Sequence, residues 1–355
     1  MLRLGYMRIF LVIVCVLLAG TKGIAQPGGQ STYSYLHMLP SARMAGSGGA
    51  DITYKDGDPA TGIFNPSLLN TEMHGRLSLN FINYLTDAKA GVSSYAFGTY
   101  GGTAAISLQY NNYGKFILTD NTSAVLGNFS AADYKLQAGF GKALNEQISL
   151  GANYSLLYSA YESYRSFGMA IDAGAHFKTI DKSFQASLLL RNLGVQLKPF
   201  VNGSREKIPL RIQGGVSYKF AHVPLRLSMI VDNMQRWNLV YRDTSLAQER
   251  DLLTGNTIPE KSLFFPNLIR HFAFGAEFSI AKVCQLRLGY NLQRQQEMKG
   301  SLRSGMAGFS AGIGIQLSKI YFSYALGAYH FYGNTHFLTI GFLPASLFKK
   351  KATGS

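Results

Sequence analysis

Apolar and polar residues alternate one by one along this chain, in stretches of about ten residues that recur through its last third. A β-strand places successive side chains on opposite faces, so this period of two predicts strands with one apolar and one polar face. Because only helices and closed barrels satisfy every backbone polar group within lipid, such strands throughout a chain predict a membrane β-barrel. The clearest stretch sets Phe309, Ala311, Ile313, Ile315 and Leu317 against Ser310, Gly312, Gly314, Gln316 and Ser318.

The connections between the predicted strands carry a second signal. Those after even-numbered strands are short, whereas most of those after odd-numbered strands are longer, up to residues 238–269. Bacterial outer-membrane barrels combine an even strand number with short periplasmic turns and longer outer loops. The sequence therefore predicts an all-β, fourteen-stranded antiparallel transmembrane outer-membrane barrel over residues 74–347, with both termini and a basic tail, residues 348–355, in the periplasm. The fourteen predicted strands span 75–85, 89–99, 102–112, 130–142, 146–159, 165–179, 183–196, 208–220, 224–237, 270–281, 283–296, 306–317, 319–331 and 335–346.

The first 25 residues have the features of a secretory signal peptide. Arg3 and Arg8 precede an apolar run over residues 9–18, and the small residues Gly23 and Ala25 precede the expected cleavage site. The run is shorter than the roughly 20 residues of a spanning helix. Residues 26–73 then show little alternation and contain many Gly, Pro and Asp residues, so they are predicted to form a separate segment before the barrel.

The net charge indicates the surroundings of the protein, and the cysteine count indicates whether it can form a disulfide. The formal charge is +15, but the basic residues are spread along the predicted polar faces of the strands. This distribution favours anionic lipid or polysaccharide surroundings over nucleic acid. After removal of the signal only Cys284 remains, which excludes an intramolecular disulfide. A lone thiol on a strand is expected to be a packing residue.

No sequence motif predicts a catalytic or cofactor site. Ser204-x-x-Lys207 and Ser346-x-x-Lys349 match the spacing of penicillin-recognising enzymes, but the companion motifs of those enzymes are absent. The glycine-rich segment 46–51 has Asp where a dinucleotide-binding loop needs its third glycine. We therefore expect a protein that is not an enzyme and that has no catalytic, cofactor-binding or metal-binding residues.

Two pairs of residues leave an ion-binding alternative open. His330 and His336 lie on opposite limbs of a tight loop, where a two-histidine metal site is conceivable; without a third ligand, a polar loop pair is the favoured interpretation. Asp56-Gly57-Asp58 matches half of a calcium loop but lacks the downstream Glu, so a turn is predicted.

Nine short segments spread over the chain carry a family resemblance: Gly28–Tyr33, Leu39–Arg43, Phe64–Leu68, Leu77–Phe81, Phe129–Tyr134, Tyr161–Tyr164, Ser166–Gly168, Leu286–Asn291 and Arg303–Ser310. Together they resemble the PorQ-like family, outer-membrane proteins of the Bacteroidetes type IX secretion system. The resemblance implies a FadL-type barrel of fourteen strands, with the N-terminal segment in or against the lumen. Asn65-Pro66 matches the Asn-Pro of FadL-like proteins, whereas Ser67 replaces their usual Ala.

The same resemblance implies a non-catalytic subunit of the cell-surface attachment complex. Such subunits hold a PorZ-like surface protein beside a PorU/PorV-like sortase and shuttle pair, which process cargo and attach it to lipopolysaccharide. A FadL-type channel for hydrophobic solutes is the alternative function. An outer-membrane hydrolase is disfavoured because no Ser–His pair is placed for catalysis. An apolar cavity would support transport, whereas a plugged lumen would support anchoring, with binding through the connections 113–129 and 238–269.

Overall fold

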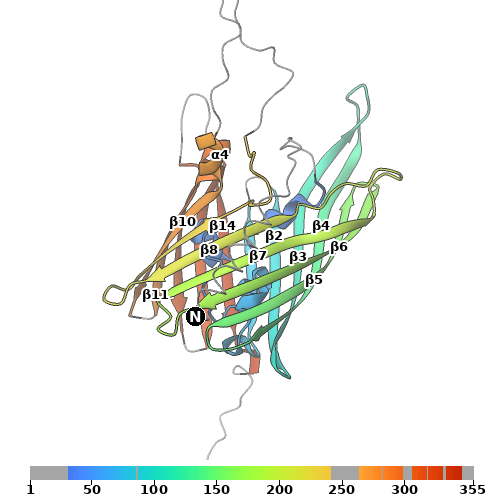
Figure 1. Ribbon diagram of the computed structural model, residues 1–355. Coiled ribbons are helices and arrows are strands. Elements are labelled where there is room, and N and C mark those ends of the chain that lie inside the picture. The colour runs from blue at the N-terminus through green and yellow to red at the C-terminus, as the bar shows by residue number, and fades with distance from the viewer. Residues whose placement is uncertain are drawn as a thin grey trace, which may run out of the picture.

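The computed structural model describes residues 31–84, 87–240, 264–281, 283–298, 306–317, 319–330 and 333–345. Their strands close into one antiparallel barrel (Figure 1), in which each strand pairs with its neighbours in sequence and β1 pairs with β14. The predicted fourteen-stranded barrel is thereby confirmed. The strands are β1 Leu77–Asn83, β2 Lys89–Thr99, β3 Gly102–Thr119, β4 Val125–Ala143, β5 Ile148–Tyr161, β6 Tyr164–Lys178, β7 Phe184–Lys198, β8 Arg211–Lys219, β9 Leu225–Val231, β10 Phe272–Ile280, β11 Cys284–Asn291, β12 Phe309–Gln316, β13 Ile320–His330 and β14 Gly333–Phe342.

Along each strand, alternate side chains face the lipid and the lumen. On β12, Ile313 and Ile315 are exposed on the outer face, whereas Ser310 is buried on the inner face. Polar residues fill inner positions of other strands too, for example Gln137 on β4 and Asn153 on β5, which are 2% exposed. An apolar outside and a polar inside are what a barrel in lipid requires.

The hairpin of β3 and β4 is longer than the sequence indicated. Most of the predicted loop 113–129 is strand, because pairing resumes beyond a bulge at Asn112/Lys115 and continues to Thr119. Phe116 and Phe129 face each other there, with their rings stacked and their centroids 5.2 Å apart. Cross-strand aromatic pairs stabilise such a ribbon. In Figure 1 this teal hairpin extends beyond the neighbouring strands.

Other predicted strand ends were too long. β11 stops at Asn291, whose side-chain oxygen accepts a 2.9 Å hydrogen bond from the backbone N–H of Arg294 and so begins helix α5, Leu292–Met298. Residues 232–237 leave the sheet after β9, and helix α4, Phe264–Arg270, precedes β10. The longest connections do follow odd-numbered strands, yet β5 and β6 are joined by only Glu162 and Ser163.

The segment that precedes β1 lies inside the barrel, and we call residues 31–73 the plug. It consists of short helical elements separated by irregular chain, and most of its residues are buried. Helix α2 packs on β11 to β14, while η2 packs on β4 to β6, so the plug crosses the lumen. Its elements are η1 Ser34–His37, α2 Ala42–Gly46, α3 Pro59–Phe64, η2 Pro66–Leu68 and η3 Thr71–Met73.

Local sequence signals explain the shape of the plug. The Ser41 hydroxyl accepts from the N–H of Met44 at the start of α2, and the Asp58 carboxylate accepts from the N–H of Ala60 at the start of α3. Glycines on the barrel wall let the plug backbone approach closely: a side chain on Gly289 would overlap the backbone at Gly48.

None of the helices among the described residues combines the length and apolarity that a membrane crossing requires. The predicted signal, residues 1–25, the tail, residues 348–355, and most of the 238–269 connection lie outside the described residues.

Candidate functional site

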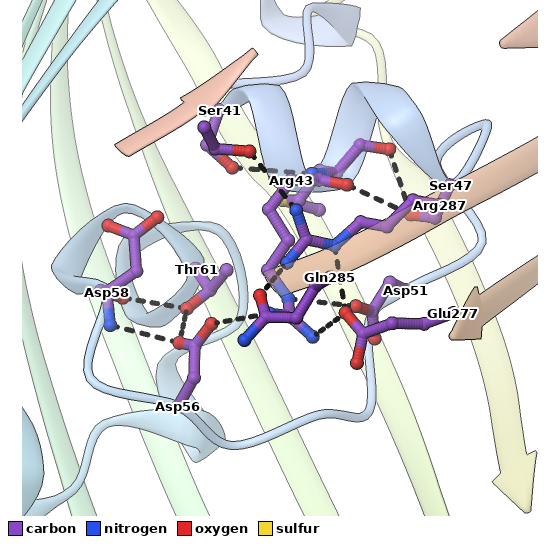
Figure 2. Close-up of polar contacts among 12 residues, drawn as sticks. Ser41, Arg43, Ser47, Asp51, Asp56, Asp58, Thr61, Glu277, Gln285 and Arg287 are labelled. Atoms are coloured by element: carbon purple, nitrogen blue, oxygen red, sulfur yellow. Dashed lines mark hydrogen bonds and ion pairs between the residues drawn. The ribbon is translucent and has the colours of Figure 1, made fainter. Parts of the chain in front are cut away.

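A buried arginine of the plug is the centre of the main polar site. Arg43 lies on α2, is 2% exposed and reaches three carboxylates (Figure 2). Its Nε lies 3.1 Å from Asp51 Oδ2 and its Nη1 lies 3.3 Å from Asp56 Oδ2, both within the plug. Its Nη2 lies 2.6 Å from Oε2 of Glu277 on β10. This one guanidinium therefore ties the plug to itself and to the wall.

The wall contributes further charges to the same cluster. Glu277 Oε2 also accepts from Nε of Arg287 on β11 at 2.8 Å, and Arg226 Nη1 on β9 lies 3.5 Å from Glu277 Oε1. Arg287 donates in addition to Ser323 Oγ on β13 at 3.1 Å and to Gln285. We call Arg43, Asp51, Asp56, Arg226, Glu277 and Arg287 the lumen network.

An aromatic ring completes the network. Tyr54 lies between two of its cations, with the Arg43 and Arg226 guanidinium carbons 4.3 Å and 3.4 Å from the ring centroid. Cations over an aromatic face are attracted by the ring quadrupole. The three arginines are therefore balanced by three carboxylates and one aromatic ring, which stabilises charges that would be costly to bury alone.

A cavity of about 270 Å³ adjoins the network. It is lined by Arg43, Asp56 and Asp58 of the plug, and by residues at the ends of β1 and β14 such as Leu77 and Phe342. Burial, followed by the charge of the adjacent Asp56, raises the pKa of Asp58. Charged walls of this kind suit water or polar solutes rather than a hydrophobic one.

The residue pairs considered for ion binding have other partners. His336 pairs in register with Leu326, and His330 pairs with Gly333, so the two residues do not face each other across the hairpin. His336 Nδ1 lies 2.7 Å from the Tyr324 hydroxyl. Across the described part of the chain, no group of three or more His, Cys, Asp or Glu residues is arranged to hold a metal ion.

The Asp56-Gly57-Asp58 segment bends as predicted. Asp56 Oδ1 accepts from the N–H of Asp58 at 3.0 Å and from Thr61 Oγ1 at 2.9 Å, while Oδ2 pairs with Arg43. Both carboxylate oxygens of Asp56 therefore serve the local fold and the network. Sequence reasoning missed the network itself, although an acid such as Glu277 at an inward strand position was a usable signal.

The fold is similar to those of solved hydrocarbon transporters. The toluene transporter TbuX of Ralstonia pickettii is 10% identical, with 88% of this chain and 99% of that chain covered and a TM-score of 0.51. The toluene transporter TodX of Pseudomonas putida is 11% identical, with 85% and 96% covered and a TM-score of 0.50. A Pseudomonas aeruginosa FadL homologue is 10% identical, with 89% and 99% covered and a TM-score of 0.48.

At such identities the likeness shows the fold alone, a FadL-like barrel. No protein-family model matches the chain. No curated protein matches it either.

Proposed function

We propose that this protein is a non-catalytic outer-membrane barrel with a closed lumen, which holds a partner at the cell surface through its outer loops. The FadL-like fold and the apolar outer face support the membrane location. In this proposal both termini lie in the periplasm, because the longest connections follow odd-numbered strands and would reach the outside.

One observation carries the closed lumen: the plug is bound to the wall by buried charges instead of lying over an apolar chamber. The cavity of about 270 Å³ beside the lumen network has charged walls. A second cavity, deeper in the barrel, has a volume of only about 20 Å³. Sites for drug-sized apolar ligands are mostly apolar and occupy several hundred Å³. Neither of these two cavities is of that kind.

The protruding β3–β4 hairpin supports a docking role. Tyr110, Tyr134 and Tyr158 lie side by side on β3, β4 and β5, with neighbouring ring centroids 5.0 Å and 6.0 Å apart. Tyrosines of this kind mark the membrane boundary. Ile117 and Val125 lie farther along the hairpin and are 64% and 68% exposed. Apolar side chains beyond the lipid boundary are suited to contact with another protein.

In its finer form the proposal assigns the protein to the attachment complex of a type IX secretion system. The partners would be a PorZ-like surface protein and a PorU/PorV-like sortase and shuttle pair, beside lipopolysaccharide. Support for this form comes from the sequence resemblance to the PorQ-like family. The comparisons with known proteins contain nothing on secretion.

A channel for hydrophobic solutes is the second candidate, and the comparisons favour it over the attachment role. The fold resembles those of TbuX and TodX, which are described as toluene transporters. For this function the plug would have to move or a path would have to open through the wall, and either change would disturb the lumen network or the strand pairing.

Two measurements test the choice. First, the tagged protein is isolated from outer membranes of its own bacterium in mild detergent, and the co-purifying proteins are identified. Second, purified protein in lipid vesicles is assayed for uptake of toluene and of a long-chain fatty acid, with empty vesicles as the control. The proposal expects a stoichiometric surface protein and no uptake above the control. Uptake without a bound partner would establish the channel instead.

A pair of matched variants tests the docking surface. Replacing Ile117 and Val125 by Ser should release the partner while the barrel still assembles, because both side chains are exposed on the hairpin. The control replaces Leu144 and Ile180 by Ser, which are exposed apolar residues in turns after even-numbered strands. Equal retention of the partner in both variants would place the interface elsewhere, for instance on the 238–269 connection.

A further inference from the structure

Two cations in the middle of the lumen are buried without an ion-pair partner among the residues that the structure describes. Lys135 on β4 is 6% exposed, and Arg191 on β7 is 3% exposed. Within the described residues, neither side chain lies within 4.0 Å of a carboxylate oxygen, and Lys135 Nζ makes no hydrogen bond. The lumen network, in contrast, pairs each of its arginines with a carboxylate.

The contacts of Arg191 leave most of its donors unused. Its guanidinium lies 3.8 Å from the ring centroid of Phe64, and Nη2 makes a long contact of 3.5 Å to the carbonyl oxygen of Leu36. Its Nε and Nη1 are buried and have no hydrogen-bond partner among the described residues. A buried donor without a hydrogen-bond partner on a charged group costs free energy of folding. An acceptor near these atoms would therefore stabilise the protein.

The nearby carboxylate is already occupied by neutral donors. Asp172 on β6 is the acid whose charge reaches both Lys135 and Arg191. Its Oδ1 accepts from the N–H of Asn192 at 2.7 Å, and its Oδ2 accepts from Gln137 at 3.1 Å. Farther along the lumen, Arg211 is neutralised by its pair with Asp232, with Nε and Oδ1 2.7 Å apart. Two positive charges thus face one negative charge in a buried setting.

A small cavity lies between these groups. Its volume is about 20 Å³, and Lys135 and Arg191 line it together with apolar residues that include Leu36, Ile63 and Phe64 of the plug. A cavity of this size has room for one water-sized guest. A single-atom anion therefore fits this volume better than sulfate, phosphate or an organic acid.

We propose that the lumen holds a binding site for one small monovalent anion of the halide class, between Lys135 and the free donors of Arg191. The anion would bring the local charge to zero and would accept from Nε or Nη1, for which the described residues supply no acceptor. Charged groups buried away from water are stable only when they are paired, and this supplies the reason for binding. The site does not depend on the proposed function.

The direct test is diffraction from crystals of the full-length protein grown in sodium bromide. An anomalous peak within contact distance of Lys135 Nζ and the Arg191 guanidinium is the expected result. Absence of a peak there, with bromide found at other positions in the same crystals, would overturn the proposal and leave water as the guest.

A second measurement does not require crystals. The melting temperature of the detergent-solubilised protein is recorded as sodium gluconate, whose anion is too large for the cavity, is exchanged for sodium chloride at constant ionic strength. The melting temperature should rise with chloride in the wild type and in the control Lys142→Met, since Lys142 is exposed on the same strand. It should not respond in Lys135→Met. An equal response in all three proteins would contradict the site.

Discussion

Arg43 and Glu277 are 234 residues apart in sequence, yet their side chains form a buried ion pair with Nη2 and Oε2 2.6 Å apart. The arginine belongs to the plug and the glutamate to strand β10 of the wall. Because Glu277 also pairs with Arg226 and Arg287, the contact joins the plug to three adjacent strands, β9, β10 and β11. The lumen is therefore closed by bonds between the plug, which precedes every strand, and three strands of the second half of the chain.

Replacing Arg43 by Met should destabilise the folded protein by about 3–5 kcal/mol, because removal of one partner leaves buried charges uncompensated. The measurement is the free energy of unfolding by urea in lipid vesicles. Arg165→Met is the control, since the hydrogen bonds of Arg165 within the described residues go to backbone carbonyl oxygens at the exposed β5–β6 turn. Equal midpoints for the two variants would mean that the network contributes nothing to stability.

Ile313→Arg should lower barrel stability by about 2–4 kcal/mol, the usual cost of a cation on the lipid face near mid-membrane. Ile313 lies in the middle of β12 with its side chain on the outer face. Ile180→Arg, in the turn between β6 and β7, should have little effect because its side chain is 76% exposed outside the strands. A larger loss for Ile180→Arg would contradict the assigned faces and depths.

Gly289→Ala should loosen the plug, because a Cβ at this position overlaps the backbone of residues 47 and 48. The expected result is faster cleavage of the plug by an added protease while the barrel remains intact. Gly91→Ala is the matched control, since its Cβ would meet nothing closer than Asn80 O at 3.8 Å. If both variants are cleaved at the wild-type rate, the plug is not held by close backbone contact at Gly289.

An epitope tag inserted at Gly255 should be accessible to antibody on intact cells, whereas a tag after Lys351 should require permeabilised cells. Both positions lie outside the described residues, so the expectation rests on the lengths of the connections. Labelling of the C-terminal tag on intact cells would invert the proposed topology.

The sequence predicted every strand of the barrel because alternation is imposed by lipid on one side and the polar lumen on the other. It failed where that constraint ends. Beyond Asn112 a bulge shifts the parity, and the hairpin lies past the girdle of tyrosines, so the residues there read as a loop. The predicted strand 283–296 includes residues 292–296, although a side-chain cap at Asn291 begins a helix there.

The lumen network could not be predicted, because an ion pair between distant residues leaves no local periodicity. Arg43 belongs to a segment that merely lacked a strand pattern, and Glu277 shares its inward position with the strand acids Asp133 and Asp172, so its position alone does not reveal its partners. The shortage of partners around Arg191 is equally invisible in sequence, since it depends on which of the few acidic residues the fold brings near. The charged side chains inside the barrel meet their partners only when the strands close around the plug.

The position of Glu277 has a consequence for biogenesis. The plug is synthesised before any strand, but the carboxylate that accepts Arg43 lies on β10, and α2 rests on β11 to β14. A polypeptide interrupted before residue 277 would lack the wall carboxylate that Arg43 binds and the strands on which α2 packs. The contacts of the plug with the wall therefore depend on the last five strands, β10 to β14. The plug, which is made before every strand, can therefore bind in its final position only after the last strands have formed.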